Sequence, residues 1–189
     1  MSHPTLGEPL PIELANTIYA RRHEIVDGLA TPGDLAAWLQ IHGCDVQADA
    51  SAAIVSEFRE LRDAIRALFR ATLDGESPPA AAVETLNRTS AAAPAFPRLI
   101  WPPDGEPRVE VASSGDNSAA AVLAGVARAA IEFLGGPDRD RLRDCQAPGC
   151  VLFFLKDHPR REWCSAGCGN RARAARHYRR HRQNESVNA

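Results

Sequence analysis

The chain has 189 residues, of which 44% are hydrophobic and 24% are charged, and its formal net charge is −2. This composition is ordinary for a globular protein and excludes a chain that is disordered throughout. No apolar run reaches the roughly 20 residues of a membrane-spanning helix, and the N-terminus lacks the pattern of a secretory signal peptide. We therefore expect a folded cytoplasmic protein.

Helical patterns dominate the first part of the chain. Apolar residues at helical spacing predict a helix over residues 13–22, and a capping threonine, a proline and a final glycine delimit a second helix over residues 31–43. The longest periodic stretch, residues 50–73, has apolar residues on one face and Arg and Glu on the other. It is expected to form the centre of the core, followed by a helix over residues 80–92.

A different pattern follows in residues 98–113, where two short apolar runs flank a segment rich in proline. This arrangement predicts a β-hairpin. Residues 116–134 then return to a helical pattern, which ends at the sequence Gly135-Gly136-Pro137. We place a domain boundary here, so that residues 1–136 form a mainly helical domain with one β-hairpin.

A few polar residues in this domain could suggest a functional site. Asn16, Thr17 and Arg21 could face an effector, but such residues more often tie a helix to a neighbouring loop, which is the interpretation we favour. His42 and Cys44 lie close together, yet without a third catalytic group they are expected to be loop or core residues. Phosphate-binding glycine loops and metalloprotease motifs are absent from the sequence. We therefore expect no catalytic residues and no enzyme activity.

The small net charge hides a strong asymmetry. Residues 139–183 contain 12 basic and 4 acidic residues, a net charge of +8, which leaves −10 on the rest of the chain. Such a division is typical of a body joined to an end that binds a polyanion. Four of the five cysteines also lie in this basic segment.

These four cysteines, Cys145, Cys150, Cys164 and Cys168, form two close pairs. In a reducing compartment, closely spaced thiols are metal ligands before they are disulfides, and four thiolates can surround one Zn²⁺ tetrahedrally. Four thiolates leave no position for a water molecule, which indicates a structural zinc ion. An iron–sulfur cluster is the alternative metal site, and a redox switch in which oxidation releases the metal is an alternative role.

The residues around the cysteines predict a module of treble-clef type. Pro148-Gly149 lets the first pair turn back as a knuckle, and the apolar run 151–155 with the turn 157–159 predicts a small hairpin between the pairs. Ser165 is expected to cap a helix whose first turn contains Cys168. The fold class of the whole chain is then α+β. The expected domains are residues 1–136, a zinc module of residues 137–184 and a flexible tail of residues 185–189.

The predicted helix carries six arginines, which repel one another unless an anion compensates them. Phosphate is the natural anion, because guanidinium groups pair with its oxygens and displaced counterions favour binding. His177 could add a contact to sugar or base, and Asn170 could read an adenine edge or cap the helix. Ala174, Ala175 and Tyr178 form an apolar strip that is expected to lie on the zinc module. The expected nucleic-acid-binding residues are Asn170, Arg171, Arg173, Arg176, His177, Arg179, Arg180 and Arg182.

Several partners fit such a helix. Duplex DNA is the leading one, whereas RNA would use the same charges and stack on Tyr178 or His177. A protein-interaction finger would bind no nucleic acid, and the acidic part of the chain could mask the arginines. One short helix reads few bases, which favours a homodimer.

Residues 139–182 resemble a known family. The motifs Cys145-x4-Cys150, Trp163-Cys164-Ser165 and Cys168-Gly169-Asn170-Arg171 resemble the CGNR zinc finger, a bacterial module. The resemblance implies that its four cysteines bind zinc and that the module binds DNA. Asp157-His158-Pro159 stands where members often carry an Asp-x-Ser turn.

Residues 9–135 are similar to a second family, the Ala-rich ABATE domain that commonly precedes this finger. The similarity lies in the segments Leu14-Ala15-Asn16-Thr17 and Asp34-Leu35-Ala36-Ala37-Trp38-Leu39, although Glu13 stands where an Asp is usual. Proteins of this build are described as stress-induced transcription regulators. The resemblance therefore implies a bacterial regulator whose first domain senses an unnamed signal.

Overall fold

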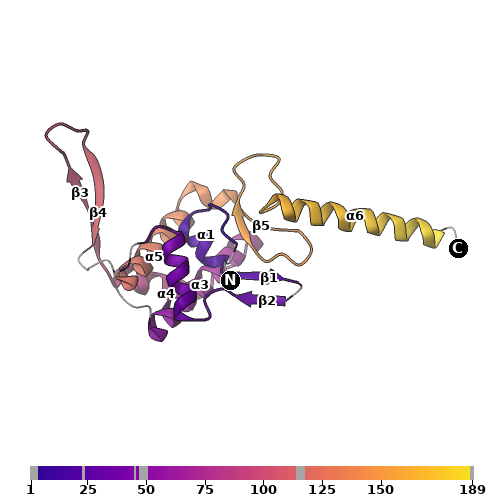
Figure 1. Cartoon of the computed structure of the whole chain (residues 1–189), viewed down its shortest axis with the longest axis horizontal. Coiled ribbons are helices and arrows are strands. Elements are labelled where there is room, and N and C mark those ends of the chain that lie inside the picture. Colours follow the sequence, from indigo (N-terminus) through magenta and orange to yellow (C-terminus); the bar gives the residue numbers. More distant parts are fainter. Residues whose placement is uncertain (1–3, 23, 45, 47–50, 114–117, 188–189) are drawn as a thin grey trace.

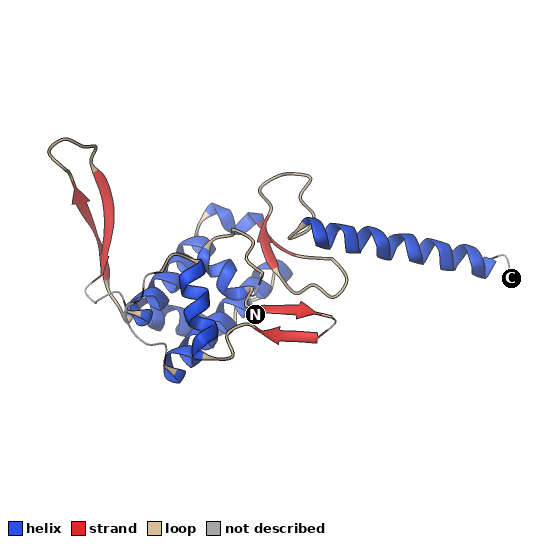
Figure 2. Cartoon of the chain, in the orientation of Figure 1, coloured by secondary structure: helices blue, strands red, loops and turns tan. Residues whose placement is uncertain are grey.

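The computed structural model describes residues 4–22, 24–44, 46, 51–113 and 118–187. It shows a helical body from which a β-hairpin and a long helix project at opposite ends (Figure 1). Strands in these ranges occur as three separate antiparallel pairs among the helices (Figure 2), so the α+β class is confirmed. None of the helices so described is both long enough and apolar enough to cross a membrane.

Six α-helices and three strand pairs make up the described part of the chain. The helices are α1 (Leu10–Ala15), α2 (Pro32–Ile41), α3 (Ala52–Asp74), α4 (Ala80–Ala91), α5 (Ala119–Gly135) and α6 (Ala166–Val187). A short 3-10 helix, η1 (Pro137–Arg141), follows α5. The antiparallel pairs are β1 (Ile18–Arg21) with β2 (Glu24–Asp27), β3 (Ala95–Ile100) with β4 (Arg108–Ser113), and β5 (Leu142–Asp144) with β6 (Phe153–Leu155).

The helix predicted over residues 13–22 is wrong in its second half. The chain is helical over α1 and then forms β1, which pairs with β2 in a hairpin that the sequence analysis missed. Asn16 ends the helix, because its side chain binds the backbone of Phe153: Nδ2 donates to the carbonyl oxygen at 2.9 Å, and Oδ1 accepts from the amide nitrogen at 2.8 Å. Tyr19 of β1 joins the buried cluster around the cysteines. These tertiary contacts override the helical spacing.

The polar residues that could have formed an effector or thiol site have structural contacts. Thr17 is fully buried, as is Asn16, and the Thr17 hydroxyl donates to the carbonyl of Leu14 at 2.8 Å. The rings of His42 and Trp38 lie 4.6 Å apart, measured between centroids. The structural interpretation of Asn16 and Thr17 is therefore confirmed.

Capping residues set the ends of α2 and α3, and Thr31 caps α2 as the sequence predicts. Thr31 and Asp34 form a reciprocal capping box, in which each side chain accepts a hydrogen bond from the other residue's backbone N–H. Ser51 caps the start of α3, and Gly75 ends it in the left-handed conformation, with a φ of 68°. The predicted start of this helix at Ala50 lies outside the described residues.

Two arginines of α3 point into the structure, although the sequence places them on the solvent face of the helix. Arg62 is only 3% exposed, and its guanidinium lies 2.6 Å from the carboxylate of Asp27 in β2. Arg66 donates to the carbonyl of Ala15 at 2.6 Å. Burial, together with the neighbouring arginines, lowers the pKa of Arg66 to about 10. The prediction that these two arginines face solvent is wrong, because their guanidinium groups bind the carbonyl of Ala15 in α1 and the carboxylate of Asp27 in β2.

One hydrophobic core crosses the predicted domain boundary. The ring of Phe69 in α3 lies 5.6 Å from that of Phe133 in α5 and 5.4 Å from that of Phe153 in β6, in edge-to-face contacts. The guanidinium carbons of Arg66 and Arg70 each lie 5.1 Å from the centre of the Phe153 ring. The predicted zinc module is thus anchored in the core of the helical body through Phe153.

The last elements of the body form where the sequence predicts them. α4 ends at Ala91, and after the β3–β4 hairpin Ser118 caps α5 through the backbone N–H of Ala121. The start predicted at residue 116 lies outside the described part of the chain. Gly136 is required after α5, because a Cβ atom there would lie 2.7 Å from the carbonyl oxygen of Glu132.

The bond between Asn16 and Phe153 can be tested by replacing Asn16 with Ala. The change leaves a buried N–H and a buried carbonyl of β6 without a partner, so the free energy of unfolding should fall by about 2 to 4 kcal/mol. Urea denaturation of the zinc-loaded protein measures this. Asn87→Ala on the exposed face of α4 is the matched control, with an expected change below about 0.5 kcal/mol. Equal effects of the two substitutions would contradict the assigned role.

Candidate metal centre and the helix it carries

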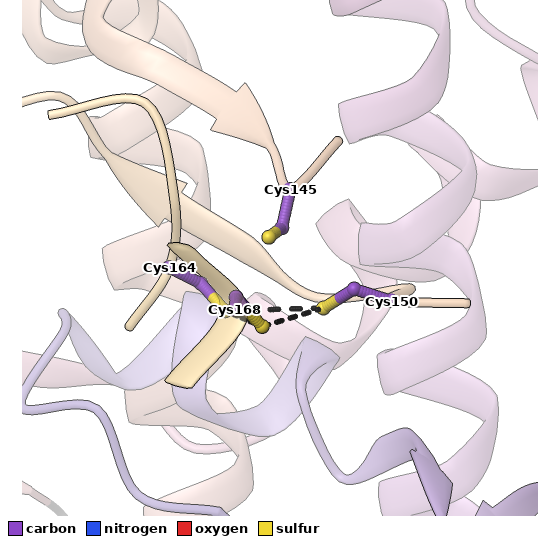
Figure 3. Close-up of side chains that lie close together, drawn as sticks. All are labelled: Cys145, Cys150, Cys164 and Cys168. Carbon is purple, nitrogen blue, oxygen red and sulfur yellow. Dashed lines mark hydrogen bonds between the residues drawn. The ribbon is translucent and has the colours of Figure 1, made fainter. Parts of the chain in front are cut away.

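The four predicted cysteine ligands meet at one point. Their sulfur atoms all lie within 4.8 Å of one another. Figure 3 shows the four side chains close together. The sulfur of Cys150 lies 3.8 Å from those of Cys164 and Cys168, which are 3.4 Å apart. A tetrahedral zinc ion with Zn–S bonds of about 2.3 Å places its ligands about 3.8 Å apart. The residues therefore fit a zinc ion, and none of the four forms a disulfide.

The first cysteine pair is held by the β5–β6 hairpin. The backbone N–H of Cys145 donates to Leu152 at 2.9 Å, and that of Cys150 donates to Ala147 at 2.9 Å. Gly149 adopts a φ of 71°, which lets the knuckle turn. The strand predicted in residues 151–155 forms as β6, but the hairpin predicted around the turn 157–159 is wrong, because β6 pairs with β5 across the knuckle.

The side chains of β6 explain this pairing. Phe153 and Leu155 belong to the core of the body, whereas Phe154 between them belongs to the cluster around the cysteines. A strand in this position must therefore have two buried faces. β6 connects the body to the metal site.

The second cysteine pair is set by the start of α6. The hydroxyl of Ser165 accepts a hydrogen bond from the backbone N–H of Cys168 at 3.2 Å, which confirms the predicted cap. Cys168 therefore lies in the first turn of the helix. Cys164 lies just before this turn, so the helix cannot move without moving two of the four sulfurs.

Residues 168–171, the Cys-Gly-Asn-Arg sequence, all take part in this local structure. A Cβ atom at Gly169 would lie 3.0 Å from the indole of Trp163, so a larger residue would displace that ring. Arg171 donates to the sulfur of Cys168 at 3.1 Å, and Asn170 accepts a hydrogen bond from Arg173. The sequence allows two roles for Asn170, base recognition or a local structural contact. The structure shows the local contact.

The sulfur cluster needs a cation to be fully ionised. Hydrogen bonds from Cys150 and Cys164 lower the pKa of Cys145 to about 2. Hydrogen bonding to Cys145 raises the pKa of Cys150 to about 11 and also raises the pKa of Cys164. Without a cation, a thiolate on Cys145 therefore disfavours ionisation of Cys150 and Cys164. A divalent metal ion lowers all of these pKa values and makes the four sulfurs ligands together.

Glu8 and Arg161 also hold the zinc module in place, although the sequence analysis did not single them out. A guanidinium nitrogen of Arg161 lies 2.6 Å from one Glu8 oxygen, and the other oxygen accepts from the backbone of Leu155 at 3.1 Å. Burial raises the pKa of Glu8 and outweighs these two contacts, which lower it. Glu8 lies in a proline-rich lead-in, where no pattern reveals a partner about 150 residues away.

α6 leaves the body after its first turns and extends away from it (Figure 1). Cys168 and Ala172 are buried, but Ala174 and Tyr178 are exposed. The prediction that this apolar strip of the helix lies on the zinc module is therefore wrong. The axis of the helix points outward, so only its first turns, up to Ala172, face the module.

The arginines beyond this turn are open to solvent. Arg173, Arg176, Arg179 and Arg180 are exposed, and no carboxylate among the described residues lies within 4.0 Å of their nitrogens. Arg182 belongs to α6, but its side chain lies outside the described residues. Within the part of the chain that is described, the acidic body does not mask the helix. The backbone remains helical through Val187, so residues 185–187 of the predicted tail extend α6.

The metal site can be tested by replacing Cys150 with Ala. Three sulfurs should not retain the ion, so zinc should fall from one ion per chain to a substoichiometric amount after dialysis against a weak chelator. Elemental analysis or native mass spectrometry measures the stoichiometry. Cys44→Ala is the matched control, because Cys44 packs against the main core far from the cluster in sequence, and it should keep one zinc ion. Full zinc in Cys150→Ala, or bound iron in the unaltered protein, would contradict the assignment.

Comparison with known families identifies both segments. The family model of the ABATE domain, described as "Putative stress-induced transcription regulator", matches residues 8–137, and that of the CGNR zinc finger matches residues 141–181. A search of the curated proteins finds no match. Both predicted resemblances are confirmed, and the four clustered sulfurs are the site of a structural zinc ion. The chain belongs to the ABATE family of regulators and carries a CGNR zinc finger after the ABATE domain.

Proposed function

We propose that this protein regulates transcription by binding duplex DNA through α6, while the zinc ion fixes the base of that helix to the body. The observation that carries the proposal is the exposure of four arginines on a helix that leaves the body. We also propose that the protein is not an enzyme. Four sulfurs fill the coordination shell of the zinc ion, so its role is to hold structure.

The charge on α6 favours a polyanion as the partner. Clustered guanidinium groups repel one another, and phosphate oxygens relieve this repulsion while bound counterions are released from the DNA. α6 has 22 residues and is thus about 33 Å long. A helix of this kind fits the major groove of B-DNA, where phosphates line both edges.

The contacts of individual residues divide the predicted binding set in two. Asn170 and Arg171 are engaged next to the metal site, so we propose that they orient the start of the helix. The remaining members would contact the nucleic acid, mostly at phosphates, which gives affinity with limited sequence recognition. These members are Arg173, Arg176, His177, Arg179, Arg180 and Arg182.

RNA is the second candidate partner, and the aromatic surface of α6 is what favours it. Tyr178 is 69% exposed, and its ring centroid lies 6.1 Å from that of His177. Exposed rings of this kind can stack on unpaired bases. Competition between a labelled DNA duplex and single-stranded RNA separates the two: DNA displaces the label at lower concentration under the leading proposal, and RNA does so under the alternative.

The contribution of the helix can be measured from the salt dependence of binding. The three arginines Arg173, Arg176 and Arg180 share one face, and replacing all three with Ala should remove about three phosphate contacts. The slope of log K against log salt for random duplex DNA should then fall in magnitude by about 2.7. Fluorescence anisotropy across several salt concentrations gives this slope.

A matched control removes the same charge elsewhere. Arg88, Arg98 and Arg108 are exposed and lie on α4 and the β3–β4 hairpin. Replacing these three with Ala should leave the slope nearly unchanged. An unaltered slope in the α6 variant, or an equal fall in the control, would contradict binding through α6.

A further inference from the structure

The β3–β4 hairpin projects from the body at the end opposite to α6 (Figure 1). Its register divides its side chains between two faces, because alternate residues of a strand point to opposite sides. On one face the cross-strand pairs are Pro97 with Val111 and Leu99 with Val109. We call these four residues the apolar face.

The opposite face of the hairpin has a different character. It carries the charged pair Arg98 and Glu110, together with the pairs Phe96 with Ala112 and Ile100 with Arg108. Cross-strand pairs of opposite charge suit a surface in water. The hairpin therefore has one face that carries charged pairs and one face without a charged residue, on which Ser113, paired with Ala95 at the base, is the polar residue.

The apolar face is uncovered in the single chain. Leu99 is 65% exposed, and Val109 and Val111 are each 70% exposed. Trp101, two residues beyond Leu99, is 67% exposed. An isolated two-stranded hairpin is marginally stable in water, and a contiguous patch of exposed apolar residues marks an interaction surface.

We infer that the apolar face binds the same face of a second copy of this chain, so that two hairpins stack about a two-fold axis. A two-fold contact brings identical residues together, which an uncharged face allows and the opposite face, with its arginines, does not. The exposed apolar side chains offer on the order of 500 Å² per chain, so the pair buries about 1,000 Å². This area is the lower limit for a specific interface, and it corresponds to a dimer that dissociates reversibly.

The position of the hairpin is compatible with this assembly. The hairpin and α6 lie at opposite ends of the molecule, so the stacked hairpins leave both copies of α6 uncovered (Figure 1). The inference does not depend on the proposed function, because it concerns the protein alone. Failure to bind DNA would leave it standing.

Sedimentation equilibrium of the full, zinc-loaded chain without nucleic acid tests the dimer. The mass should rise with concentration in the micromolar range toward twice that of one chain. Leu99→Lys places two cations against the interface and should raise the dissociation constant at least tenfold, which corresponds to about 1.4 kcal/mol. Phe96→Lys makes the same kind of change on the opposite face of the same strand and should leave the dissociation constant within about twofold.

A milder variant covers the case in which Leu99→Lys unfolds the hairpin. Val111→Thr keeps the shape and the β-branched side chain, so the hairpin should persist while the dimer weakens and the emission of Trp101 moves toward that of a hydrated indole. A monomer at all concentrations would overturn the inference. Dimers of unaltered strength in both Leu99→Lys and Val111→Thr, or dissociation by Phe96→Lys alone, would overturn it as well.

Discussion

The mutual repulsion of four sulfur atoms within 4.8 Å is the constraint on which the rest of this structure depends. Thiols at this separation cannot all ionise unless a cation lies among them, and a tetrahedral zinc ion meets both the spacing and the charge. The sulfurs come from the β5–β6 knuckle and from the start of α6, which are otherwise joined by a loop. The zinc ion therefore holds these two segments together and determines where the helix points.

The zinc finger packs against the ABATE domain and shares its hydrophobic core. Phe153 lies against Phe69 of the central helix, and its backbone pairs with the side chain of Asn16. Arg161 and Glu8 add a second link between the two segments. A change of conformation in the helical domain would thus be transmitted to the base of α6 through β6.

Local chemistry made part of this structure predictable. Cysteine spacing identified the zinc ligands, and Thr31 and Ser165 cap their helices because a capping side chain acts on a backbone only three residues away. Asn16 could not be understood from its neighbours, since its partner lies 137 residues further along the chain. The same limit hid β1, the buried side of α3 and the outward direction of α6, where Tyr178 meets solvent although helical spacing placed it on the module. Contacts between residues far apart in the sequence determine each of these three features.

Hydrogen–deuterium exchange of the zinc-loaded protein, with and without duplex DNA, tests most directly the claim that α6 is the binding element. None of residues 173–180 is buried, so their amides should exchange rapidly in the free protein and slow markedly when DNA is bound. Amides of the β3–β4 hairpin, at the other end, should not change on DNA addition. Protection that spares α6 while DNA is bound would contradict the account.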